Sequence, residues 1–258
     1  MADLAKLAGL VGLHGLPGPL QLNGPTPVKR GGGRGTPRFT ISPAIGGKTV
    51  WDLDRDGPLV IPQTSAGVLY TLTAEGDFTA PIKMWGAGGG QRGAGRCGGG
   101  GGMVGGVMRF RRGAVYTLLA GEDRYQHDTN NLQGGGKSNL SGTTNTGCPG
   151  GGFSFIRRGA SGTDYLAIAP GGGGSGWAGA GGAGGDFEAG LDGYGRNTAG
   201  PGADGGGKGA TATAGGAKGA GSGGQAGSAF QGGNSSGGGG GGGGYFGGGG
   251  AGNSTSSP

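Results

Sequence analysis

The sequence predicts a mainly β fold in which short strands lead into a long, coil-rich glycine lattice, with an extended arm at the N-terminus. Alternating apolar and polar residues recur in short segments between residues 38 and 169, and this period is that of a half-buried strand. Glycine makes up 80 of the 258 residues and comes in blocks, without the strict triplet period of collagen. Residues 21 to 38 are rich in proline, glycine and arginine and have no apolar period, as expected for an arm or linker.

The N-terminal arm comprises residues 1 to 37, and the sequence offers no partner strand to cover its leucines. One or two helical turns are expected within residues 2 to 11. Four Gly-x-y triplets follow from Gly9, and in a collagen-like coil they would imply a trimer. The preferred interpretation is a docking peptide that becomes ordered on a larger assembly. The leucines expected to anchor it are Leu4, Leu7, Leu10, Leu13, Leu16 and Leu20.

Residues 38 to 66 are predicted to be a β-linker region. Phe39 and Ile41 alternate with polar residues, and a second apolar stretch precedes the turn signal Asp56-Gly57-Pro58. Leu59 to Ile61 follow that turn as a further short strand.

Residues 67 to 258 are predicted to form one glycine-rich domain that contains three hairpins. The first joins residues 68–73 to residues 78–85 through a turn at Glu75-Gly76, and one of its faces is buried. Pro81 cannot donate a ladder hydrogen bond, so an edge or a bulge is expected there. The other two hairpins join residues 107–110 to 115–119 and residues 153–156 to 165–169.

The glycine blocks, such as Gly237 to Gly244, are expected to take the polyglycine-II form, whose amides and carbonyls point outward around the axis. Neighbouring helices can satisfy one another only where no side chain holds their axes apart. A Cβ at Gly241 should therefore be destabilising, whereas a valine at Ala251, expected at an exposed end of the block, should be mild. Alanine interruptions are expected to face outward, and aromatic residues to cap the lattice or cover its faces: Trp177, Phe187, Phe230, Tyr245 and Phe246.

Four stretches carry a resemblance to a known family: "TLTAEGDFTAPIKMWGAGGG", "GGGGGMVGGVMRF", "YLAIAPGGGGSG" and "GGGGGGGGYFGGGG". They resemble a glycine-rich domain of bacteriophage structural proteins, of the tail-fibre and spike adhesin type. They are also similar to the glycine-rich domain of anaplastic-lymphoma-kinase-type receptors. The resemblance implies a small β-sandwich with inserted polyglycine-II helices, and in a phage protein it implies a place in the virion. With no kinase, no membrane span and no convincing signal peptide, the phage type is favoured.

Charge and cysteine content exclude several function classes. The formal net charge is +6, a mild bias over this length, and the basic cluster from Lys29 to Arg34 is one short RGG-like copy, so no nucleic-acid partner is expected. Cys97 and Cys148 fit no zinc spacing; they form one disulfide or are two small buried thiols. No apolar run is long enough to span a membrane.

No enzyme, metal site or cofactor is expected. Glu122, Asp123, His127 and Asp128 lie close together in sequence, but this polar segment between glycine blocks is interpreted as an exposed loop. The stretch "GAGGGQRG" lacks both the lysine and the strand-to-helix context of a phosphate loop.

The expected function is that of a phage virion subunit, a tail fibre, spike or decoration protein made in the host cytoplasm. Its partners would be other virion proteins, further copies in a homo-oligomer such as a trimer, and a host-surface receptor. Two alternatives remain open: a purely architectural virion subunit, and a glycine-rich RNA-binding or extracellular matrix protein. Tyr, Asn and Arg are good contact residues, and the candidate receptor contacts are Tyr125, Gln126, His127, Asn130, Asn131, Asp192, Tyr194, Arg196 and Asn197.

Overall fold

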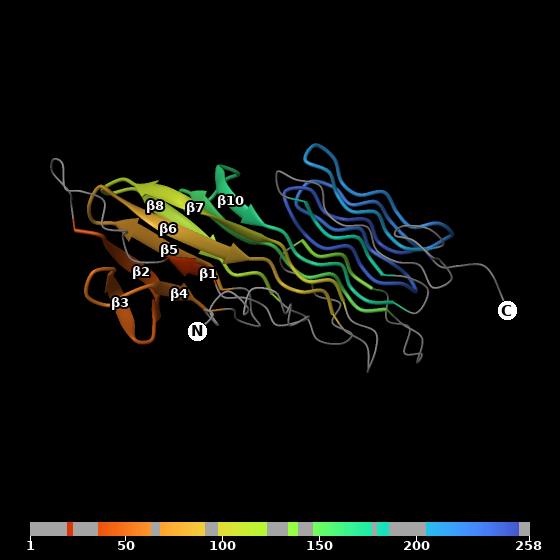
Figure 1. Ribbon diagram of the computed structural model, residues 1–258, viewed down its shortest axis with the longest axis horizontal. Coiled ribbons are helices and arrows are strands. Elements are labelled where there is room, and N and C mark those ends of the chain that lie inside the picture. The colour runs from red at the N-terminus through yellow and green to blue at the C-terminus, as the bar shows by residue number, and fades with distance from the viewer. Residues whose placement is uncertain are drawn as a thin grey trace, which may run out of the picture.

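The computed structural model describes residues 20–22, 36–62, 68–90, 98–122, 134–138, 147–176, 180–185 and 205–252, with the backbone alone for residues 20–22. Two antiparallel sheets occupy one part of the molecule, and a set of glycine-rich segments that lie side by side occupies the other (Figure 1). The described residues contain no helix. The predicted mainly β class is therefore confirmed.

The smaller sheet has four strands in the order β4-β1-β6-β7. Its long members are β6 (Phe78–Trp85) and β7 (Met103–Phe110), which pair over their whole length in one uninterrupted register. The short strand β1 (Leu20–Leu22) lies between β4 (Leu59–Ile61) and β6. Pro81 lies just beyond the last β1–β6 pair, Leu22 with Ile82, so its missing amide proton interrupts no described ladder bond with β1.

The larger sheet has six strands in the order β10-β9-β8-β5-β2-β3. All of its neighbouring strands pair antiparallel. The strands are β2 (Arg38–Ile45), β3 (Lys48–Asp52), β5 (Tyr70–Ala74), β8 (Val115–Leu119), β9 (Ser154–Arg158) and β10 (Tyr165–Ala169).

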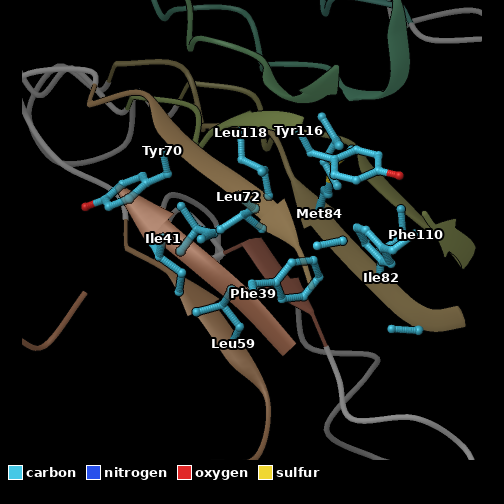
Figure 2. Packing of buried hydrophobic residues seen from close by; sticks show 14 of the residues in the cluster. Phe39, Ile41, Leu59, Tyr70, Leu72, Ile82, Met84, Phe110, Tyr116 and Leu118 are labelled. Atoms are coloured by element: carbon cyan, nitrogen blue, oxygen red, sulfur yellow. The ribbon is translucent and has the colours of Figure 1, made fainter. Parts of the chain in front are cut away.

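The two sheets share one hydrophobic core (Figure 2). Alternate residues of the strands point into it, as in β5, where Tyr70, Leu72 and Ala74 are buried. Aromatic rings join the sheets across this core: Phe39 of β2 contacts Phe110 of β7 edge to face, with ring centroids 4.9 Å apart. Burial of this apolar surface is the main stabilising force for the sheets.

Two of the three predicted hairpins are wrong in their pairing. β5 and β6 are consecutive in sequence, yet they belong to different sheets, and the same holds for β7 and β8. The turn at residues 75–77 thus crosses from one sheet to the other. Both strands still bury alternate side chains in the same core, so the alternation that predicted a hairpin is equally compatible with a crossing. The third hairpin, β9 with β10, is confirmed by their antiparallel register.

The division of the chain also differs from the predicted one. The range 38–66 contributes β2 and β3 to the larger sheet and β4 to the smaller sheet, so it belongs to both layers of the domain. Within the arm, Leu20–Leu22 pair with β4 and β6 of the same chain, although the sequence offered no sign of a partner strand. Leu4, Leu7, Leu10, Leu13 and Leu16 lie outside the described residues.

The glycine-rich segments run side by side beyond the ends of the strands (Figure 1). We refer to them as the glycine array. In the part of residues 171–252 that the structure describes, the only β pairing consists of isolated bridges. The array comprises residues 86–90, 98–102, 134–138, 147–153, 170–176, 180–185, 205–210, 214–220, 224–228, 231–235, 238–244 and 246–252.

Candidate functional site

Residues 238–244 lie at the centre of the glycine array. Their backbone amides and carbonyl oxygens form hydrogen bonds with the backbones of segments that are far apart in sequence. Because glycine has no side chain, these backbone groups are the segment's only polar interactions, and burial requires that they be paired. The segments bonded to it are 134–138, 147–153, 170–176, 180–185, 231–235 and 246–252.

The bonds of this central segment repeat every third residue. The amides of Gly240 and Gly243 donate to the carbonyl oxygens of Cys148 and Gly151, at 3.0 and 2.9 Å. The two residues between them donate to different segments: Gly241 to Gly233 and Gly242 to Gly182. Successive residues therefore face different neighbours, and residues three apart face the same one.

Close approach of the backbones leaves no room for a Cβ atom at the glycines in the centre of the array. An ideal Cβ built on Gly240 would lie under 3.0 Å from the backbone of Gly136, and one built on Gly242 would meet the backbone of Gly171 equally closely. Real Cβ atoms essentially never show such contacts, and backbone atoms cannot swing aside as a flexible side chain can. The glycines are thus required by packing.

Segment 214–220 shows how side chains are accommodated at the surface of the array. Gly216 and Gly219 are buried against residues 246–252, to which both donate hydrogen bonds. Ala217, Lys218 and Ala220 are exposed. The prediction that alanines face outward is correct on this face.

The same prediction is wrong for other alanines. Ala251 and Ala210 are completely buried, and Ala87 is also buried. The Ala251 amide donates to Gly239, and the Ala251 carbonyl oxygen accepts from the Ser235 hydroxyl at 2.6 Å. Ala251 follows the last glycine block in sequence but lies between other segments in space, so it is not the exposed end that the sequence suggested.

Ser235 is a buried polar residue that sequence reasoning missed. Besides its bond to Ala251, its hydroxyl oxygen accepts the amide of Gly238 at 2.8 Å. It thereby joins the segment that ends at residue 235 to the one that begins at residue 238. The signal in the sequence was a serine pair just before the longest glycine run, at a point where the chain must turn.

A row of aromatic rings, which we call the aromatic seam, connects the array to the outer face of the larger sheet. Phe153 directly precedes β9, Phe155 lies in β9 and Tyr165 in β10, whereas Phe230 and Tyr245 lie in connections between array segments and Phe246 begins segment 246–252. The Tyr165 and Phe230 centroids are 5.0 Å apart, and the Phe230 and Tyr245 centroids 5.3 Å. Phe230 has φ of 59°, a left-handed conformation that is unusual for a bulky residue.

The residues proposed from the sequence as receptor contacts lie outside the described ones. Tyr125, Gln126, His127, Asn130 and Asn131 fall between Glu122 and Gly134, and Asp192, Tyr194, Arg196 and Asn197 fall between Gly185 and Gly205. Trp177, Phe187 and Cys97 also lie outside, so the pairing of the two cysteines stays open. Glu122, expected in an exposed loop, is buried, as is Cys148.

Charge is concentrated in the turn between β3 and β4. Asp56 accepts hydrogen bonds from Arg55, from the Asp52 amide at 3.0 Å and from Lys48 Nζ at 3.0 Å. These donors, with Arg55 the largest contributor, hold the pKa of the Asp56 carboxyl far below its ordinary value. The Lys48 ammonium also lies 4.9 Å from the Trp51 ring centroid. This cluster stabilises a turn and offers no catalytic arrangement.

Within the described ranges, no group of three or more His, Cys, Asp or Glu side chains is placed to hold a metal ion. No helix there is long and apolar enough to cross a bilayer. Comparison with known proteins gave no relative: no family model matches the chain, and no curated protein or solved structure matches it significantly.

Proposed function

We propose that this chain is a structural subunit of a bacteriophage virion, a tail fibre, spike or decoration protein that projects its glycine array from a β-sandwich. The observation that carries the proposal is the direction of the array. Residues 86–90 directly follow β6, residues 98–102 directly precede β7, and residues 170–176 directly follow β10. These segments therefore run from the sheets toward the end of the array that is remote from them (Figure 1).

We further propose that the array is a bundle of polyglycine-II helices. The form has about three residues per turn and no internal hydrogen bonds, and the three-residue repeat of bonds along residues 238–244 agrees with it. A bundle of this kind would hold the connections between its segments in fixed positions, even though the sequence of the segments is of low complexity. Those connections carry most of the polar and aromatic side chains of the glycine-rich region.

Protection of backbone amides tests the bundle. Hydrogen–deuterium exchange should show slow exchange for Gly240 to Gly243, whose amides all donate within the array. The exposed turn 211–214 serves as the internal control and should exchange fast. Equally fast exchange at Gly240 to Gly243 and in the turn 211–214 would show that the glycine segments do not form a bundle.

Particle composition tests the virion role. Mass spectrometry of gradient-purified particles should find this chain in a fixed ratio to the major structural proteins. If the chain were abundant in the soluble lysate and absent from purified particles, the virion proposal would be abandoned.

Anchoring by the N-terminal arm is tested by a truncation that starts at residue 20. This boundary keeps β1, which pairs with both β4 and β6, whereas removal of all of residues 1–37 would take a strand from the sheet. The truncated protein should fold with an unchanged melting temperature and fail to join particles. Normal incorporation would show that the arm is not the anchor.

Host attachment is tested by competition. Purified full-length protein should slow phage adsorption, and replacement of residues 125–131 by Gly and Ser should abolish this effect. Replacement of the exposed Thr211 and Thr213 in the described turn is the matched control and should leave it intact. A folded wild-type protein that never competes would favour the purely architectural virion role.

A further inference from the structure

Residues 98–102 form a side-chain-free border of the array. Gly99 and Gly102 donate to Gly173 and Pro170, both at 2.7 Å, and their carbonyl oxygens accept from residues 86–90. Among the described residues, the amides of Gly100 and Gly101 have no hydrogen-bond partner. Within the described residues, segment 98–102 thus bonds to two neighbouring segments, whereas the central segment 238–244 bonds to many more.

Within the described part of the chain, this border is open as well as unpaired. A Cβ atom built on Gly100 would meet nothing within 4 Å, in contrast to the glycines at the centre of the array. Gly99 and Gly100 are both exposed. Unpaired backbone groups at an exposed edge are a template for another chain.

Two other outer faces of the array, among the described residues, carry exposed side chains. Segment 214–220 exposes Ala217 and Lys218, and segment 224–228 exposes Gln225 and Ala226. Such side chains keep a further glycine segment at a distance, as lysines do on protected sheet edges. The bare border at residues 98–102 therefore differs in kind from these faces.

Strand β7 continues the same border into the smaller sheet. It follows Gly102 directly, is the edge strand of its sheet, and has a regular ladder with β6 over eight residue pairs, without a bulge. Val107 is 72% exposed and Met103 57% exposed. A long, regular edge strand with exposed apolar residues is the kind of edge that pairs with another strand.

We infer that two copies of this chain associate through residues 98–102, in an antiparallel two-fold arrangement centred near Gly100, with the exposed edge strand β7 flanking the contact in each copy. At the centre of this array a Cβ on most glycines would clash with a neighbouring backbone, so a segment that bonds to residues 98–102 in the same way needs glycines at its contact positions. The same five glycines in a second copy meet this requirement. A two-fold axis pairs a border with itself, so each copy supplies donors where the other supplies acceptors. The inference does not depend on the virion role.

Sedimentation equilibrium of the full chain tests the inference. Wild-type protein should shift from monomer to dimer mass with concentration, and Gly100→Glu should weaken dimerisation about tenfold or more, because two carboxylates would face each other across a backbone contact. Ala226→Glu introduces the same charge on a face that already carries side chains and should dimerise like the wild type.

Three results would overturn the inference: a wild type that stays monomeric, a Gly100→Glu protein that dimerises normally, or equal weakening by Ala226→Glu. Exchange of the wild-type amides at Gly100 and Gly101 provides a readout that needs no variant. These amides should be protected at high protein concentration and unprotected on dilution. Protection that does not change with concentration would contradict the inference even if Gly100→Glu proved unstable.

Discussion

An ideal Cβ on Gly241 would lie under 3.0 Å from the backbone of Gly248, a residue on the adjacent segment 246–252. The two segments bond to each other through Gly248, whose amide donates to Gly242 at 2.9 Å. This contact explains why the longest glycine run of the chain, Gly237 to Gly244, carries no side chain. Any side chain there must separate backbones that also exchange hydrogen bonds.

Gly241→Val should therefore destabilise the protein by about 2–4 kcal/mol, through overpacking and the loss of several buried hydrogen bonds. Gly100→Val is the matched control, because a Cβ built on Gly100 would meet no described atom within 4 Å. It should change stability by less than about 0.5 kcal/mol. Thermal unfolding in dilute solution measures both, and equal small shifts would mean that the central glycines tolerate side chains.

Ala251→Val should also be destabilising, by about 1–3 kcal/mol, because Ala251 is completely buried and bonded through both of its backbone groups. Ala226→Val is the control, since Ala226 is exposed on the array surface. Denaturant unfolding of the two variants compares them directly. A small loss of stability in both variants would contradict the buried position of Ala251 and would agree instead with an exposed end of the block.

Phe230→Ala should cost about 1.5–3 kcal/mol, because it removes the ring that joins Tyr165 to Tyr245 in the aromatic seam. Phe230→Gly should be no worse than Phe230→Ala, since glycine adopts the positive φ of this position without strain. Leu69→Ala, at a residue 47% exposed, should change stability little. Equal melting temperatures for wild type and Phe230→Ala would show that the seam does not hold the array to the sheet.

Asp56→Asn should reduce stability at neutral pH and have a smaller effect in acid. The folded protein lowers the pKa of Asp56 below the ordinary value of about 3.9. The carboxylate therefore contributes stability that is fully present above that ordinary value and is lost as the pH falls toward the folded pKa. Urea unfolding from pH 7 down to about pH 3 measures the difference between wild type and variant. The exposed Asp54→Asn is the control, and a wild-type advantage that does not shrink in acid would contradict this assignment.

The sequence by itself determined where most of the strands lie, although it gave no sign of β1 (Leu20–Leu22). The alternation around Phe39 and Ile41 and that between Phe78 and Met84 each correspond to a strand whose alternate residues are buried. It also identified the positions where backbones can pack closely, because only glycine lacks the Cβ that such packing excludes. These are local properties, fixed by the residue type at each position.

The tertiary structure alone decided which segments are neighbours. Lys137 donates its amide to the side chain of Asn234, and Gly241 accepts a hydrogen bond from Gly136, although neither pair is close in sequence. Backbone groups of glycine are identical at every position, so nothing in the glycine blocks encodes a partner or a register. The partner is set by the strands that precede or follow each block and by the aromatic seam. For the same reason Ala251 is buried and Ala226 exposed, and strands β5 and β6 enter different sheets.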